Sequence, residues 1–237
     1  MPDILLIETA TEVCSVAVFS ENRITALREN QNCSNHAAEL TLLVNECMKD
    51  AALNFTDLDA VAVSGGPGAY TSLRVGASVA KGLCYALDKP LIAFDTLLVL
   101  AAAGKQQIPG NQKLLLLPAV DARRQEVWMA LYNEKLELLL SAQPFILDDG
   151  SVWEFCMKMV PDAHERQLVV VGNGTPKIRN QHFGGNPRFP DMVRCSAGYA
   201  GETALQCYLA GEFQDVAYYE PFYMKPPNIT VSKQAPL

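Results

Sequence analysis

The sequence predicts an α/β protein built from two similar lobes, each with the element order β-β-β-α-β-α. Apolar runs of strand length alternate with stretches of helical periodicity along most of its 237 residues. A polar, turn-rich stretch at 104–112 interrupts this alternation, and after it the same order begins again. We therefore expect one lobe at 1–104 and a second at 105–237, with the tail of the second packing back on the first.

The elements of the first lobe follow from the spacing of apolar residues and from capping signals. Ser34 or Asn35 is suited to cap the first helix, and Asp88-Lys89-Pro90 ends the second one. The predicted elements are strands at 4–9, 13–19 and 23–29, a helix at 36–52, a strand at 60–63, a helix at 70–87, a strand at 91–94 and a helix at 96–103.

The second lobe repeats this architecture with little residue identity. A strand at 114–120 ends in Asp121, as the first strand of the chain ends in Glu8. A second strand is predicted at 127–132, and a strand at 168–171 runs into another glycine turn. A last helix is expected at 201–210, followed by an extended proline-rich segment at 221–227.

Composition narrows the range of functions. The 19 basic and 26 acidic side chains give a net charge of −7, which does not favour autonomous binding of nucleic acid. No apolar run reaches membrane-spanning length and no signal peptide is visible, so we expect a cytoplasmic protein. The seven cysteines form no C-x-x-C pair, which indicates reduced thiols and argues against a disulfide framework or a zinc knuckle.

A glycine turn joins the strand at 60–63 to the helix at 70–87. Such turns present backbone N–H groups and the positive end of a helix dipole, an arrangement that often binds anions. Neither a P-loop nor a dinucleotide fingerprint fits, because Tyr70, Thr71 and Ser72 stand where those motifs need glycine or lysine. A tight connection that binds nothing is the other interpretation. The candidate anion- or nucleotide-proximal residues in the two lobes are Gly66, Gly68, Arg123, Gly172 and Gly174.

The helix at 70–87 is rich in small residues, among them Gly76, Ala77, Ala80 and Gly82. Small residues let another helix approach closely. They are explained either by packing within the lobe or by contact with a second protein chain, and the pattern alone leaves both open.

Several segments in the right order resemble one known family. GPGAYTSLRVGASVAKGL at 66–83 resembles the GPGSFTGLRVG…AKGLA signature of the bacterial TsaB family, also called YeaZ. DARRQEV at 121–127 is similar to its DARR-x-EV segment, 172–174 stands where it has GDG, and 221–225 matches its P-x-YLR end. The family is a glycoprotease-like member of the actin-like ATPase superfamily.

The resemblance implies two actin-like (ASKHA, ribonuclease H-like) lobes and a non-catalytic scaffold role. It implies help in N6-threonylcarbamoylation of adenosine 37 in tRNA by a TsaD-type paralogue whose metal is held by an H-x-x-x-H pair. It also implies that a TsaE-type ATPase joins the scaffold and the paralogue, and that tRNA binds only to the assembled complex. Without its partner, the scaffold is expected to form a homodimer. We expect no cofactor on this chain alone, with ATP or ADP at the complex junction. The expected partner interface is His36, Leu40, Leu43, Tyr70, Leu73, Arg74, Gly76, Ala77, Ala80 and Lys81.

The residues themselves argue against independent catalysis. The second histidine of a metal pair would stand at Leu40, so His36 is interpreted as a helix cap or surface residue and no metal site is expected. The Asp-x-Gly hairpin of active relatives is replaced by Glu8-Thr9-Ala10, which disfavours ATP hydrolysis and leaves Glu8 as a strand-end carboxylate that caps a turn. Arg123 and Arg124 are adjacent, so on an extended backbone one points inward and one outward.

Two alternatives stay open. In the first alternative, the chain holds an unrecognised nucleotide or metal site and acts alone as an enzyme, either an actin-like ATPase or kinase or a glycoprotease-like peptidase. In the second alternative, the chain pairs with itself, excludes the partner and has a binding role of its own as a homodimer.

Overall fold

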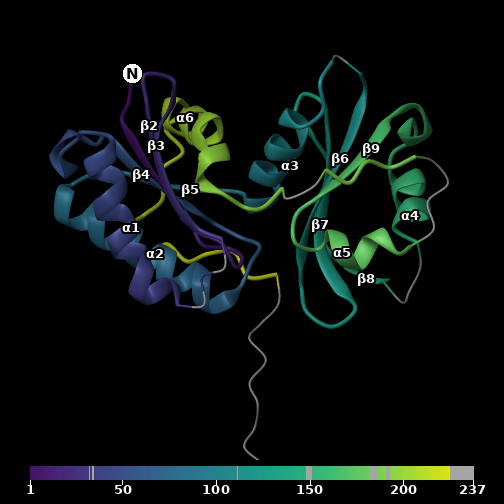
Figure 1. Cartoon of the computed structure of the whole chain (residues 1–237), viewed down its shortest axis with the longest axis horizontal. Helices are drawn as coiled ribbons and strands as arrows, with labels where there is room; N and C mark the ends of the chain where they lie inside the picture. Colours follow the sequence, from purple (N-terminus) through teal and green to yellow (C-terminus); the bar gives the residue numbers. More distant parts are fainter. Residues whose placement is uncertain are drawn as a thin grey trace, which may run out of the picture.

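The computed structural model describes residues 1–31, 33, 35–110, 112–147, 151–181, 186–190 and 193–224. These residues form two α/β lobes that lie side by side, each with its own sheet (Figure 1). Ser34, one of the two predicted helix caps, and the proline-rich end at 225–227 lie outside the described residues.

The first sheet contains β1 (Ile4–Glu8), β2 (Cys14–Ser20), β3 (Arg23–Asn30), β4 (Ala60–Ser64) and β5 (Leu91–Phe94). Its strand order is β3-β2-β1-β4-β5, with β1 antiparallel to β2 and parallel to β4. Strands β1 and β4 are buried along their whole length. They read as continuous apolar runs because helices cover both faces of this sheet.

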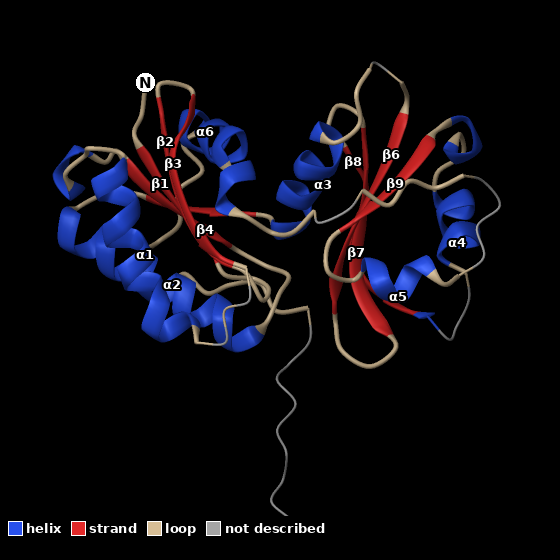
Figure 2. Cartoon of the chain, viewed as in Figure 1, coloured by secondary structure: helices blue, strands red, loops and turns tan. Residues whose placement is uncertain are grey.

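Helices α1 (His36–Asp50) and α2 (Tyr70–Leu87) cover one face of the first sheet (Figure 2). The side chain of Asn35 caps α1 by accepting a hydrogen bond from Ala38 N at 3.2 Å. The predicted helix bounds of 70–87 are confirmed, and the helix ends at Asp88 in the left-handed conformation. The opposite face packs against α6 (Gly201–Ala210), which contacts β1 and β5.

The second sheet repeats the topology of the first. Its strands are β6 (Leu114–Asp121), β7 (Glu126–Asn133), β8 (Leu138–Ile146) and β9 (Gln167–Val171). The order β8-β7-β6-β9 matches β3-β2-β1-β4, again with one parallel pair. One face carries α4 (Val152–Met159) and α5 (Thr175–Arg179), and the other carries α3 (Thr96–Gln106). This confirms the predicted repeat of one unit.

The two halves of the chain exchange helices. Helix α3, from the first half, packs on β6 and β9 of the second sheet, and α6, from the second half, packs on the first sheet. The predicted boundary at 104/105 falls inside the last turn of α3, which extends three residues beyond the predicted end at 103. The lobes are therefore joined by packing as well as by the connecting chain.

The segment after α6 runs back along the first lobe to the N-terminal end of α2. Gln214 N donates to Leu91 O at 2.8 Å, and Phe222 N donates to Gly65 O at 2.8 Å. Between them, Lys81 Nζ on α2 donates to the carbonyls of Ala217 and Tyr219, each at 3.1 Å. We call residues 213–224 the return segment. Among the described residues, no helix has both the length and the apolar character needed to cross a membrane.

Candidate functional site

A cleft of about 530 Å³ lies between the lobes. The first lobe contributes the β1–β2 loop at 10–12 and the first turn of α2, and the second lobe contributes the β6–β7 turn at 120–123. The ends of β1 and β6, equivalent strands of the repeated unit, meet here. A cleft at the ends of such strands is where open α/β sheets bind ligands.

Glu8 closes the end of β1 beneath this cleft and is fully buried. Its Oε1 accepts a hydrogen bond from Ala10 N at 2.6 Å, which is the turn-capping role expected from the sequence. Its Oε2 is buried without a hydrogen-bond partner among the described residues. Burial raises the pKa of this carboxyl to about 7, so near neutral pH it is partly protonated.

Close backbone packing explains the four glycines that the sequence suggested for anion binding. A Cβ at Gly66 would meet Phe222 O at 2.6 Å, and one at Gly68 would meet Ala10 O. Side chains at Gly172 and Gly174 would both strike the carbonyl of Ala119. Gly68 also lines the cleft, whereas the other three do not. The geometry therefore favours the tight-connection interpretation over an anion site.

Arg123 and Arg124 lie in a turn with left-handed backbone conformations, at φ of 66° and 50°. The expectation of an extended pair, with one side chain inward and one outward, was wrong because this turn reverses the chain between β6 and β7. Both residues are exposed. Arg123 lines the cleft, and its N–H donates to Asp121 Oδ1 at 2.6 Å.

A chain of polar contacts crosses the cleft. Asn173 Nδ2 donates to Glu12 Oε2 of the first lobe at 2.7 Å, while its Oδ1 accepts from Asp121 N at 2.9 Å. Lys177 Nζ lies 2.6 Å from Asp121 Oδ1 and neutralises that carboxylate. The sequence reasoning missed Glu12 and Lys177. The available signal was Asn173 itself, because an amide can donate to a carboxylate where the family's aspartate cannot.

Six of the predicted interface residues are buried within their own lobe, where they pack in its interior instead of facing solvent. The family resemblance pointed to these two helices, and these residues lie on the sides of the helices that pack within the lobe. At Gly76, for example, an added Cβ would strike Thr9 Oγ1. The six residues are His36, Leu40, Leu73, Gly76, Ala77 and Ala80.

Two more predicted interface residues, Tyr70 and Lys81, contact the return segment, and a third, Arg74, contacts Tyr70. The rings of Tyr70 and Tyr223 lie 4.6 Å apart between centroids, and the guanidinium of Arg74 lies 4.8 Å from the Tyr70 centroid. Lys81 binds the carbonyls of the same segment. Leu43, half-buried, packs against the core of the first lobe.

The solvent-facing side of α1 and α2 carries large apolar and small residues that the sequence reasoning did not select as a set. Leu42 on α1 is 62% exposed, and Tyr85 on α2 is 86% exposed. Ala38, Ser78 and Gly82 are also exposed, and a Cβ at Gly82 would have no described residue within 4 Å. We call these five residues the outer face. Helical periodicity marks the buried face of each helix and therefore also the opposite, solvent-facing side, so it could have identified these residues.

His36 is buried, so the interpretation as a cap or surface residue was wrong; Asn35 is the cap. Its Nε2 lies 3.3 Å from Val13 O. A ligand atom of His36 and the sulfurs of Cys14 and Cys33 all lie within 4.8 Å of one another. The sequence signal was the pair Cys33-x-x-His36, which a search for C-x-x-C motifs passes over. Burial raises the pKa of the Cys14 thiol to about 12.

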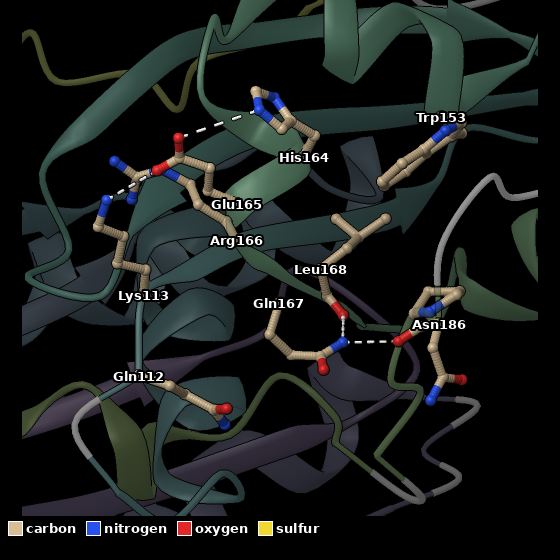
Figure 3. A pocket seen from close by; sticks show the side chains of 10 residues that line it. Gln112, Lys113, Trp153, His164, Glu165, Arg166, Gln167, Leu168 and Asn186 are labelled. Atoms are coloured by element: carbon tan, nitrogen blue, oxygen red, sulfur yellow. Dashed lines mark hydrogen bonds and ion pairs between the residues drawn. The ribbon is translucent and has the colours of Figure 1, made fainter.

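Another pocket, of about 380 Å³, lies on the second lobe beside the start of β9 (Figure 3). Its charged groups are already paired. Lys113 Nζ lies 3.0 Å from Glu165 Oε2, and Arg166 forms ion pairs with Asp162 at 2.9 Å and Glu134 at 3.1 Å. These charges therefore stabilise the pocket wall, which leaves the inter-lobe cleft and the outer face as the better candidate sites.

The repeated strand order, the cleft between the lobes and the strand-end acidic residues define the class of actin-like (ASKHA) two-lobed α/β proteins. Comparison with known proteins narrows the class. The family model described as TsaD, tRNA N6-adenosine threonylcarbamoyltransferase, matches residues 30–219. The Escherichia coli tRNA threonylcarbamoyladenosine biosynthesis protein TsaB is 34% identical over 236 residues, covering 94% of each chain. The Bacillus subtilis protein of that name is 33% identical over 73% of this chain and 71% of its own.

Solved structures agree with these sequence matches. One described as an uncharacterized protein with similarity to peptidase YEAZ, from Pseudomonas aeruginosa, has a TM-score of 0.79 at 25% identity and covers 95% of this chain and all of its own. YeaZ from the same organism has a TM-score of 0.76 at 25% identity, covering 94% of this chain and all of its own. The chain belongs to the TsaB (YeaZ) family.

Proposed function

We propose that this chain acts in tRNA N6-threonylcarbamoyladenosine biosynthesis as a non-catalytic scaffold that docks a metal-bearing TsaD-type paralogue through its outer face. The names of its TsaB relatives support the pathway. In the same proposal a TsaE-type ATPase joins the pair, and ATP or ADP binds at the junction between the subunits. The chain contacts tRNA only as part of the complex.

The observation that carries this proposal is the exposure of the outer face. Leu42 and Tyr85 hold large apolar groups in water, and Ala38, Ser78 and Gly82 leave the helix backbones open to close approach. Exposed apolar side chains beside small residues suit a helix–helix contact with another chain. In the same proposal the chain pairs with a second copy of itself through this face when the paralogue is absent, because the second copy presents the same helices.

The cleft supports a non-catalytic role. Glu8 is buried and bonded to the backbone of its own loop, so it does not project a carboxylate into the cleft. Asp121, at the equivalent position in the second lobe, is paired with Lys177. Both strand-end carboxyl groups, which would orient metal and phosphate in an active relative, are therefore engaged within this chain.

A binding experiment tests the docking surface. Leu42→Arg and Tyr85→Arg place charges on the outer face, and we expect each to weaken the complex with the TsaD-type paralogue at least tenfold in titration calorimetry. Leu209→Arg is the matched control, because Leu209 is 68% exposed on α6, away from these helices. Failure of the unmodified proteins to form a complex at micromolar concentration would overturn the proposal.

The role in the cell is tested by nucleoside mass spectrometry of tRNA. Depletion of this protein should abolish the threonylcarbamoyladenosine peak, and Leu209→Arg but not Tyr85→Arg should restore it. An unchanged threonylcarbamoyladenosine peak under full depletion would show that this protein is not required in the pathway and would overturn the proposed role. Turnover of ATP, a sugar or a peptide by the isolated chain would then favour the alternatives of an ATPase or kinase, or a glycoprotease-like peptidase, acting alone. A homodimer that resists the paralogue would favour an independent binding role.

A further inference from the structure

The first lobe holds two thiols and an imidazole in one buried cluster at the edge of the cleft. The ligand atoms of Cys14, Cys33 and His36 lie within 4.8 Å of one another. Tetrahedral zinc places its thiolate and imidazole ligands roughly 3.5–4 Å apart, given Zn–S near 2.3 Å and Zn–N near 2.0 Å. Small rotations of the side chains therefore bring these donors to coordination distance.

We propose that Cys14, Cys33 and His36 form a zinc site, with the fourth coordination position open toward the inter-lobe cleft. Cys33 and His36 also line the cleft, so a water molecule or a ligand in the cleft can reach that position. Three protein ligands with one open position are the pattern of zinc sites that bind exchangeable ligands. This site does not depend on the proposed scaffold role.

The backbone positions the three residues from separate segments. Cys14 is the first residue of β2 and pairs with Asn30 in the sheet. Cys33 N donates to Glu12 O at 2.9 Å, which fastens the β3–α1 connection to the β1–β2 loop. His36 is the first residue of α1. A bound ion would thus tie together the β1–β2 loop, the β3–α1 connection and the start of α1.

The histidine is suited to bind a metal in one tautomer. A carbonyl oxygen only accepts, so the contact between His36 Nε2 and Val13 O makes Nε2 the donor and leaves the lone pair on Nδ1. Metal-bound histidines commonly donate their second ring N–H to a carbonyl or a carboxylate in this way.

The electrostatics of the cluster favour a cation. The acidic side chains that act on Cys14 are Glu39 and, more weakly, Glu8, which is partly protonated near neutral pH. Binding Zn²⁺ releases one proton from each thiol, so the charge of the buried cluster is unchanged by the exchange. A borderline-soft ion such as Zn²⁺ fits two sulfur donors and one nitrogen, whereas Mg²⁺ and Ca²⁺ require oxygen ligands.

Titration of the full-length, reduced, metal-free protein with Co²⁺ and then Zn²⁺ tests this site. We expect one equivalent of Co²⁺ to produce thiolate-to-cobalt charge transfer and the visible bands of a tetrahedral site, and Zn²⁺ to abolish both. Cys33→Ser and His36→Gln should weaken Co²⁺ binding at least tenfold. The matched control, Cys207→Ser, changes a half-buried thiol on α6 and should bind as the unmodified protein does.

Melting curves of the metal-free proteins show which variants are folded. Because the two variants change different ligands, the test remains decisive if one of them does not fold. Zn²⁺ should raise the Tm of the unmodified protein and of Cys207→Ser and leave that of His36→Gln unchanged. The absence of stoichiometric Co²⁺ binding would overturn the site, as would tetrahedral spectra that persist in both cluster variants.

Discussion

The side-chain amide of Asn173 joins the two lobes, because its Nδ2 donates to Glu12 Oε2 at 2.7 Å across the cleft. Its Oδ1 is held by Asp121 N on its own lobe. The two ends of the amide thus connect the loop after β9 to the end of β6 and to the β1–β2 loop. These contacts supply an inter-lobe restraint in addition to the packing of α3 and α6.

Replacement of this amide by a carboxylate should loosen the cleft. Asn173→Asp removes the only donor that Asn173 presents to Glu12 and sets two acceptors against each other, so we expect the free energy of unfolding to fall by about 1–3 kcal/mol. Urea denaturation measures this loss. Adding Glu12→Gln restores a donor and should recover at least half of it; failure of this rescue would contradict the assigned contact.

Glu8 should make stability depend on pH. Its pKa rises from 4.5 to about 7 on folding, so between these values the folded protein binds more protons than the unfolded chain. The contribution of Glu8 to the free energy of unfolding is therefore greatest below pH 4.5. It falls by roughly 3 kcal/mol in total as the pH rises to about 7. Glu8→Gln keeps a neutral hydrogen-bonding side chain and should flatten this part of the stability curve. A curve from pH 5 to 8 that is the same in both proteins would contradict the buried carboxyl.

Two glycines of α2 should respond in opposite directions to alanine. Gly76 faces Thr9 at a distance that leaves no room for a Cβ, so Gly76→Ala should lower the free energy of unfolding by about 1–3 kcal/mol. Gly82 is exposed with open space around it, so Gly82→Ala should raise stability by about 0.5–1 kcal/mol through helix propensity. Chemical denaturation of the two variants measures both effects, and the same sign for both would contradict the assigned faces of α2.

Lys81 should control how tightly the return segment is held. Its ammonium group binds two carbonyls of that segment, and Lys81→Met keeps the aliphatic stem while removing both hydrogen bonds. We expect local opening to become roughly tenfold more frequent, equivalent to about 1.5 kcal/mol. Limited proteolysis and hydrogen exchange at 213–224 report this opening. Lys49→Met on α1 is the control, and equal protection in the two variants would show that Lys81 does not retain the segment.

Local patterns in the sequence were sufficient for most of the fold. The bounds of α2, α6 and β5 agree with the prediction because each element is delimited by glycine, proline or a capping residue next to a clear periodicity. The repeated order of the two halves predicted two sheets with matching topology. Residues that decide these features lie within a few positions of one another, where propensity and periodicity act.

The candidate sites were less accessible to this reasoning. The interface residues were expected from the family resemblance, and among them the structure buries Gly76 and Ala80 within their own lobe. The turn at 123–124 was taken as extended because adjacent arginines carry no signal for left-handed backbone.

The sequence by itself determined the secondary structure, the repeat and the family resemblance, since all three are written in local pattern and motif order. Only the tertiary structure brought Asn173 to Glu12, 161 positions away, and Lys81 to the return segment, 136 and 138 positions away. It also gathered Cys14, Cys33 and His36 into one cluster. These relationships depend on how whole elements pack to exclude water, and no short window of residues encodes that outcome.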